Sequence, residues 1–143
     1  MQLHHALTQL LLILALLQTA AASAFEYELR TIATGLDKPW SIAAIDGNAF
    51  LVTEKAGRLI RLDATGGVAT IRGTPEVYSA SQGGLLEVLP DPGFSQNRTV
   101  YLSFSGGDKS ANRTTVIKAL LDGDTLTNPE TILEVSPDKE GPA

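Results

Sequence analysis

The chain has 143 residues, of which 43% are hydrophobic, and a formal net charge of −5 at pH 7. An acidic chain without a basic cluster argues against nucleic acid or an anionic membrane surface as a partner. The sequence has no cysteine, and its two histidines are His4 and His5. Residues after the N-terminal stretch therefore offer no Ser-His-Asp or Cys-His catalytic site and no typical zinc site.

The first 24 residues have the pattern of an export signal. They contain no Asp, Glu, Lys or Arg, and an apolar run over residues 10–17 precedes Ala22-Ser23-Ala24. This pattern is typical of a cleaved signal peptide, and the run is shorter than the roughly 20 residues of a membrane span. We expect residues 1–24 to be removed before Phe25, which leaves a secreted or periplasmic domain of residues 25–143 and no other membrane contact. An uncleaved N-terminal anchor is the alternative.

The first half of the remaining chain predicts short strands joined by tight turns. Residues 26–32 alternate polar and apolar side chains, the period of a half-buried strand. Asp46-Gly47-Asn48 is a strong hairpin signal between two apolar runs. We expect further strands over residues 40–45, 49–53, 58–62 and 68–71.

The second half repeats this plan with longer loops. Pro90 follows an apolar run and lacks a backbone donor, so we expect the strand before it to end early. Aligning the halves matches Ile42 with about Leu86, Val52 with Leu102, and Ile60 with Ile117. The expected strands cover residues 85–89, 99–104, 114–121 and 131–135.

Four strands in each repeat, and no helical period after the signal, predict an all-β fold. Repeats of this kind, about 40–50 residues long, are typical of β-propeller blades. A single β-sandwich or barrel built from the same strands is the alternative. Two blades would leave open faces, so self-association through those faces is possible.

The stretch Gln82-Gly83-Gly84-Leu85 is the main candidate site, because a polar loop runs there directly into an apolar strand. Gln82 is either a site residue or a loop amide that caps the strand. The two glycines are expected to serve backbone shape rather than ligand contact. Trp40 follows a proline at a strand start, and we expect it to be core rather than a platform for a ligand.

Charged residues in turns are weaker candidates. Asp91, Asp122 and Asp124 could bind calcium, but the turns that carry the last two lack the further ligands of a calcium loop. Glu54, Lys55 and Arg58 could form a charged rim. For all of these residues we expect solvated turn charges.

Four motifs then occur in order. They are Leu36-Asp37-Lys38-Pro39-Trp40-Ser41-Ile42-Ala43, residues 51–59 (LVTEKAGRL), residues 82–88 (QGGLLEV) and residues 97–104 (NRTVYLSF). Together they resemble the N-terminal part of the soluble, PQQ-dependent aldose sugar dehydrogenases, the glucose/sorbosone dehydrogenase family. The resemblance runs from about Thr34 to Leu133, which is most of the chain after the signal.

The resemblance implies part of a six-bladed β-propeller, of which this chain would supply about two four-stranded blades. Such enzymes oxidise the C1 hydroxyl of aldoses to lactones, with PQQ and calcium as cofactors and an external electron acceptor. The glutamine of the QGGLL motif contacts the sugar in that family. Here that residue is Gln82, whose amide offers two donors and one acceptor to sugar hydroxyls.

The resemblance also implies what this chain lacks. The family's general base is a histidine downstream of the matched region, and the groups that hold PQQ and calcium come from later blades. We therefore expect no catalytic residue in this chain, no stable binding of PQQ or calcium, and no activity of this N-terminal fragment alone. The alternative function is an exported, non-enzymatic, propeller-like binding or assembly module.

Overall fold

The computed structural model describes residues 26–136, 138 and 140–141. The expected signal peptide and its cleavage site before Phe25 lie outside these residues. The chain divides into two units, residues 1–30 and 31–143. The described part of the first unit, residues 26–30, is exposed and contains no helix or strand. Within the described ranges, no helix is long and apolar enough to cross a membrane.

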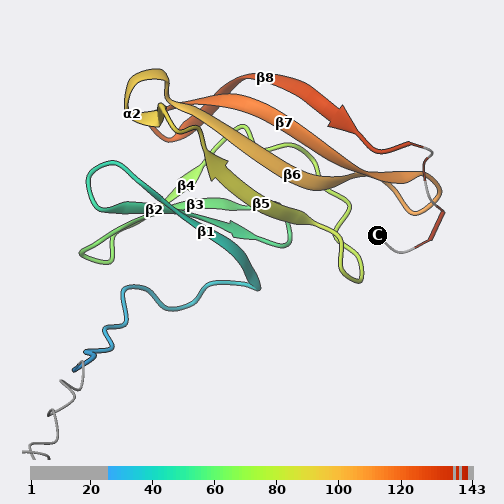
Figure 1. The fold of residues 1–143 in the computed structure, drawn as a ribbon. Coiled ribbons are helices and arrows are strands. Elements are labelled where there is room, and N and C mark those ends of the chain that lie inside the picture. The colour runs from blue at the N-terminus through green and yellow to red at the C-terminus, as the bar shows by residue number, and fades with distance from the viewer. Residues whose placement is uncertain (1–25, 137, 139, 142–143) are drawn as a thin grey trace, which may run out of the picture. The chain divides into compact units, whose positions relative to one another are not determined.

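The second unit begins with a four-stranded antiparallel sheet in chain order, here called sheet 1 (Figure 1). Tight turns join its strands, and Gly47 adopts a φ of 73° in the first of them. Asp63 shapes the last turn, because its carboxylate accepts the main-chain N–H groups of Thr65 and Gly67 at 2.8 and 2.9 Å. The strands are β1 (Pro39–Ile45), β2 (Ala49–Glu54), β3 (Leu59–Asp63) and β4 (Val68–Ile71).

A second four-stranded antiparallel sheet, sheet 2, repeats this topology. A single helical turn, α2 (Phe94–Asn97), lies in the connection between its first two strands. The central strands are longer than those of sheet 1 because the β6–β7 hairpin extends further. The strands are β5 (Leu85–Pro90), β6 (Thr99–Gly107), β7 (Asn112–Asp122) and β8 (Thr125–Glu134).

The main core lies between the two sheets. Alternate residues of a strand point to opposite faces of its sheet, so Leu51 and Leu59 face sheet 2 while Val52 and Ile60 face away. All buried members of this core are at most 6% exposed. They are Leu51, Leu59, Ile71, Leu85, Val88, Phe94, Val100, Leu102, Phe104, Ile117, Ala119, Leu121 and Leu126.

A smaller cluster covers the other face of sheet 1. Val52, Ile60 and Leu62 are each at most 4% exposed, and Ala33 and Leu36 pack against them. The segment before β1 therefore shields part of that face, although it forms no strand. Ile42 and Val68 remain 64% and 56% exposed.

The paired residues of the two sheets confirm the internal repeat and refine its alignment. Val52 pairs with Ile60, and Leu102 pairs with Ile117 at the matching place in sheet 2. Leu102 pairs on its other side with Val88 rather than Leu86, because the register shifts between Leu85 and Val88. The alignment of Ile42 with Leu86 is therefore wrong by two residues, and Val88 is the counterpart.

The same pairs show that the sheets stack in the same sense. Val52 and Ile60 face away from sheet 2, whereas their counterparts Leu102 and Ile117 face sheet 1. The face of sheet 2 that packs against sheet 1 is therefore equivalent to the outward face of sheet 1.

The predicted strand over residues 26–32 is wrong. Residues 26–36 form no helix or strand, and Tyr27 and Leu29 are 84% and 98% exposed. Alternation alone does not make a strand, because the polar backbone groups of a strand need a neighbouring strand as hydrogen-bond partner.

Two strand boundaries also differ from expectation. Pro90 is the last residue of β5 and lies opposite Val100, so the strand does not end before it. Because β5 is an edge strand, the missing donor removes no ladder bond within sheet 2. The last strand begins at Thr125, six residues before the expected start at Thr131.

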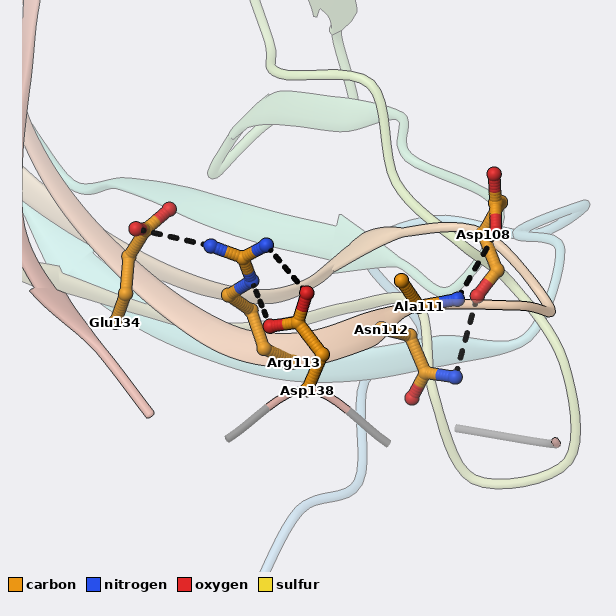
Figure 2. Close-up of polar contacts among 6 residues, drawn as sticks. All are labelled: Asp108, Ala111, Asn112, Arg113, Glu134 and Asp138. Atoms are coloured by element: carbon orange, nitrogen blue, oxygen red, sulfur yellow. Dashed lines mark hydrogen bonds and ion pairs between the residues drawn. The ribbon is translucent and has the colours of Figure 1, made fainter. Parts of the chain in front are cut away.

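The β6–β7 hairpin holds the last described residues. Figure 2 shows the guanidinium of Arg113 between the carboxylates of Glu134 and Asp138, at 3.2 and 2.6 Å. The side-chain amide of Asn112, 2% exposed, donates to the carbonyl of Gly141 at 3.0 Å. These contacts fasten the segment after β8 along the hairpin.

Candidate functional site

Gln82 lies in a turn directly before β5, and its side chain is exposed. The N–H of Gly83 donates to the carbonyl of Ala80 at 2.8 Å, which closes the turn. Ser81, the residue before Gln82, adopts a φ of 51°, in the left-handed region that few non-glycine residues enter. The turn therefore presents the Gln82 amide to solvent on a constrained backbone.

Lys55, in the β2–β3 turn of sheet 1, fastens this turn from one side. Its ammonium donates to the carbonyl of Ser81, and its own carbonyl accepts the N–H of Leu85 at 3.0 Å. Gly84 lies between these contacts with a φ of 146°, and a Cβ there would lie 2.2 Å from the carbonyl oxygen of Lys55. Only glycine fits, which confirms the expected backbone role of Gly84.

Strand β6 holds the same segment from the other side. The N–H of Ser105 donates to the carbonyl of Gly84 at 2.9 Å, and the N–H of Tyr78 donates to the carbonyl of Ser105 at 2.7 Å. The segment before β5 thus runs between the β2–β3 turn and the far end of β6. Both sheets contribute to the position of Gln82.

Polar bonds between the sheets continue along β5. The hydroxyl of Thr53, a fully buried residue, donates to the carbonyl of Leu86 at 2.6 Å. One residue further on, the hydroxyl of Ser41 donates to the carboxylate of Glu87 at 2.7 Å. These bonds fix β5 against β1 and β2, so the start of β5, where Gln82 lies, is fixed as well.

Trp40 is not a core residue, which corrects the expectation from its sequence context. Its side chain is 47% exposed at the start of β1. The ammonium of Lys55 lies 6.0 Å from the centroid of the indole ring, at the limit of a cation–π contact. Trp40 is therefore joined through Lys55 to the turn that carries Gln82.

Glu54 also differs from expectation, because it is buried rather than solvated. Its residue is 2% exposed, and its carboxylate accepts two bonds from the Arg58 guanidinium, from Nε and, at 2.7 Å, from Nη2. It also accepts the N–H of Asp37 at 2.7 Å. The hydrogen bond from Arg58 is the main reason that the pKa of Glu54 is lowered, and burial partly opposes it. Glu54 therefore has a structural role: it binds the main chain at Asp37, two residues before β1 begins.

Two of the aspartates considered for calcium, Asp91 and Asp124, serve a turn and an ion pair. Asp91 accepts bonds from the Asn97 side-chain amide and the Gly93 N–H, each at 2.8 Å, and from the Tyr101 hydroxyl at 3.0 Å. These bonds, that from Asn97 first, lower the pKa of Asp91. Asp124 pairs with Arg61 at 2.7 Å.

No metal centre is evident in the part of the chain that the structure describes. No group of three or more His, Cys, Asp or Glu side chains could hold an ion among residues 26–136, 138 and 140–141.

The sequence predicted the position of the exposed Gln82 turn. It did not reveal the roles of Lys55, Trp40 and Glu54, because no local pattern records contacts between the two sheets.

Comparison with known proteins identifies the family. Residues 36–143 match the family described as Glucose / Sorbosone dehydrogenase. The aldose sugar dehydrogenase YliI of Escherichia coli is 40% identical over 72 residues, which cover 49% of this chain and 19% of that protein.

Two solved structures share the fold. The apo-form of the soluble aldose sugar dehydrogenase of Escherichia coli is 34% identical with a TM-score of 0.68, over 72% of this chain and 31% of that one. The PQQ-bound aldose sugar dehydrogenase of Streptomyces coelicolor is 33% identical with a TM-score of 0.67, over 76% and 34%.

The chain spans about a third or less of the length of these relatives. Its two four-stranded antiparallel sheets are consistent with part of a propeller of this kind. The match extends over most of the chain and includes the turn that carries Gln82. The chain belongs to the glucose/sorbosone dehydrogenase family.

Proposed function

We propose that this chain forms part of a PQQ-dependent dehydrogenase that oxidises aldoses at C1 to lactones and passes the electrons to an external acceptor. Family membership and the PQQ-bound relative support this reaction class. The observation that carries the assignment is the exposed amide of Gln82 on a turn that Lys55 and Gly84 hold in place. In the complete protein, the two sheets would be two blades of a six-bladed propeller.

The role of Gln82 in this proposal is to orient the sugar. A side-chain amide provides two donors and one acceptor, which match the alternating donors and acceptors of neighbouring sugar hydroxyls. The constrained turn reduces the conformational entropy that the amide loses on binding. We assign no general base within the described residues.

The described residues do not fit the cofactors. Calcium takes six to eight oxygen ligands, and no group of three acidic side chains is present within the described ranges. Four arginines that could meet the carboxylates of PQQ are already engaged, because Arg58, Arg61, Arg98 and Arg113 each pair with a carboxylate of the chain. We therefore propose that this chain alone binds neither PQQ nor calcium stably.

Two measurements on the purified chain test the proposal. With PQQ, calcium, glucose and a redox dye, we expect no dye reduction above background, and turnover would contradict the assignment of the reacting groups to other segments. Calorimetric titration with glucose should show binding that Gln82→Ala weakens about threefold to tenfold, the loss of roughly one hydrogen bond. Gln96→Ala removes another exposed amide and is the control, and equal affinity in both variants would contradict the role of Gln82.

Export is part of the same proposal. A protein processed before Phe25 would be secreted or periplasmic, where aldoses from outside the cell are accessible. Mass spectrometry of the chain recovered from a bacterial periplasm should give a mature N-terminus at Phe25. An intact Met1 in the recovered protein would contradict cleavage.

A non-enzymatic assembly module is the second candidate, and exposed apolar side chains favour it. Leu89 of β5 and Leu120 of β7 are 59% and 37% exposed on sheet 2. Sedimentation velocity at increasing concentration would then show self-association that Leu89→Lys reduces. Sedimentation as a monomer at all concentrations would rule this candidate out.

A further inference from the structure

We propose that Trp40, Lys55 and Gln82 form one aldose-binding subsite, in which the indole of Trp40 stacks against the apolar face of a pyranose ring. This inference rests on the proposed function, because it takes the sugar assigned to Gln82 as its ligand. It adds a stacking residue and a positioning residue that the sequence motifs did not indicate.

The exposure of Trp40 is the first observation. Tryptophan is highly buried on average in folded proteins, and yet this indole is 47% exposed at the start of β1. Its neighbour Ser41 is tied to sheet 2 through Glu87, so the strand itself is firmly held. An exposed aromatic ring on a fixed backbone provides a large contact surface at a low cost in conformational entropy.

The second observation is the continuity from Trp40 to Gln82. The Lys55 ammonium lies 6.0 Å from the indole centroid and donates to the carbonyl of Ser81, the residue before Gln82. An ammonium group has three donors, so two remain for a ligand after the bond to Ser81. The ammonium thus links the indole, at the start of β1, to the turn that carries the Gln82 amide. Figure 1 shows that β1 and β5 begin at the same end of the two sheets.

These three groups match the two chemical surfaces of a pyranose. Its ring carries C–H groups on its faces and hydroxyls around its edge, so a flat aromatic ring suits the first and polar donors suit the second. Trp40 would contact a face, while Gln82 and Lys55 would bond to edge hydroxyls. Lys55 is also a positioning residue, because its bond to Ser81 supports the left-handed turn before Gln82.

Trp40 provides its own probe, because it is the single tryptophan of the chain. We would titrate the purified chain with glucose and record both tryptophan emission and binding heat, with sorbitol, which has no ring, as the ligand control. Glucose should change the emission saturably and with the same midpoint as the heat, and sorbitol should not. Trp40→Leu, followed by heat alone, should bind glucose about threefold to tenfold more weakly, the range for an aromatic contact.

Variants of Lys55 separate positioning from overall stability. Lys55→Met should weaken glucose binding at an unchanged melting temperature, and Lys55→Arg, which keeps a donor, should restore it. Lys118→Met removes a positive charge from β7, where Lys118 pairs with Glu130, and should have no effect on binding.

The outcomes distinguish this inference from the proposed function. Glucose binding that depends on Gln82, without an emission change and with normal affinity in Trp40→Leu, would overturn the stacking role and leave the proposed function in place. An emission change that persists in Gln82→Ala at full affinity would support the Trp40 platform and overturn the role of Gln82. Absence of any saturable response in the folded chain would overturn the subsite.

Discussion

The hydroxyl of Thr53 donates a 2.6 Å hydrogen bond to the main-chain carbonyl of Leu86, and so joins the second strand of sheet 1 to the first strand of sheet 2. The same oxygen accepts the N–H of Ser41 at 3.0 Å. Thr53 is fully buried, so neither bond can be replaced by water without a rearrangement. One side chain thereby helps to set the register of β5, which follows the candidate site.

Thr53→Val should destabilise the chain, because it removes the donor to Leu86 and the acceptor for Ser41 while conserving volume. We expect the free energy of unfolding to fall by about 1–3 kcal/mol, the cost of unsatisfied buried polar groups. Urea denaturation followed by circular dichroism would measure this change. Thr70→Val, on an exposed residue of β4, is the matched control and should change stability by less than about 0.5 kcal/mol.

Gly84→Ala should be among the most damaging small changes in the chain. The new Cβ would lie 2.2 Å from the carbonyl oxygen of Lys55, and the φ of 146° is already unfavourable for alanine. We expect a loss of about 3 kcal/mol in the same urea experiment. Gly47→Ala has a φ of 73° and meets no atom within 4 Å, so it should cost only about 1–2 kcal/mol. Equal losses in the two variants would contradict the steric explanation.

Glu54 should make the stability of the chain depend on pH in the acid range. Its pKa is lowered in the folded state, mainly by the Arg58 hydrogen bond, so the folded protein binds this proton less readily than the unfolded chain. Its contribution is therefore fully present above the ordinary glutamate pKa of about 4.3 and is lost as the pH falls through the lowered folded value. Melting temperatures measured from pH 7 down to pH 3 should show this decline.

Glu54→Gln isolates that contribution. The amide cannot form the charge-assisted bond to Arg58, so we expect a loss of about 1–3 kcal/mol at pH 7 and a shallower decline toward pH 3. Glu76→Gln, which changes an exposed glutamate, would serve as the control. If the melting temperature falls equally steeply toward pH 3 in Glu54→Gln and in the unmodified chain, Glu54 is not the origin of the pH dependence.

Asp124→Asn should have a small effect, although it breaks an ion pair between the sheets. The Arg61 and Asp124 side chains are 2.7 Å apart but 42% and 38% exposed. Water screens such pairs, so we expect a loss within about 1 kcal/mol that shrinks further in high salt. A loss of several kcal/mol in the free energy of unfolding that does not depend on salt would contradict this prediction.

Much of the fold could be predicted from the sequence because each strand carries a local signal. Alternating apolar residues and Gly- or Asp-containing turns located all eight strands, and Val52 and Leu102 were correctly placed at equivalent positions. The segment over residues 26–32 has the same alternation but forms no strand, because pairing is not encoded within a single segment. The start of β8 was missed because Asn128 and Pro129 interrupt the pattern within the strand.

The candidate site could be predicted only in part. The paired glycines after Gln82 marked a constrained turn, and Gly84 requires one. The sequence predicts the wrong environment for Trp40 and for Glu54. Trp40 is exposed beside Lys55, and Glu54 is buried by its bonds to Arg58 and Asp37, so neither environment follows from the adjacent residues in the sequence. A side chain next to a proline or in a charged turn carries no local information about what packs over it.

The same-sense stacking of the sheets also limits how copies of this chain could meet. The outward face of sheet 1, where Ile42 and Val68 remain exposed beside the buried Val52 and Ile60, is the counterpart of the face with Leu102 and Ile117 that sheet 2 turns inward. This face is complementary to the opposite face of another copy and not to the same face. It therefore favours a head-to-tail contact over a two-fold symmetric dimer. Association through these faces would instead add copies head to tail, and it would end only where the rotation from copy to copy closes a ring.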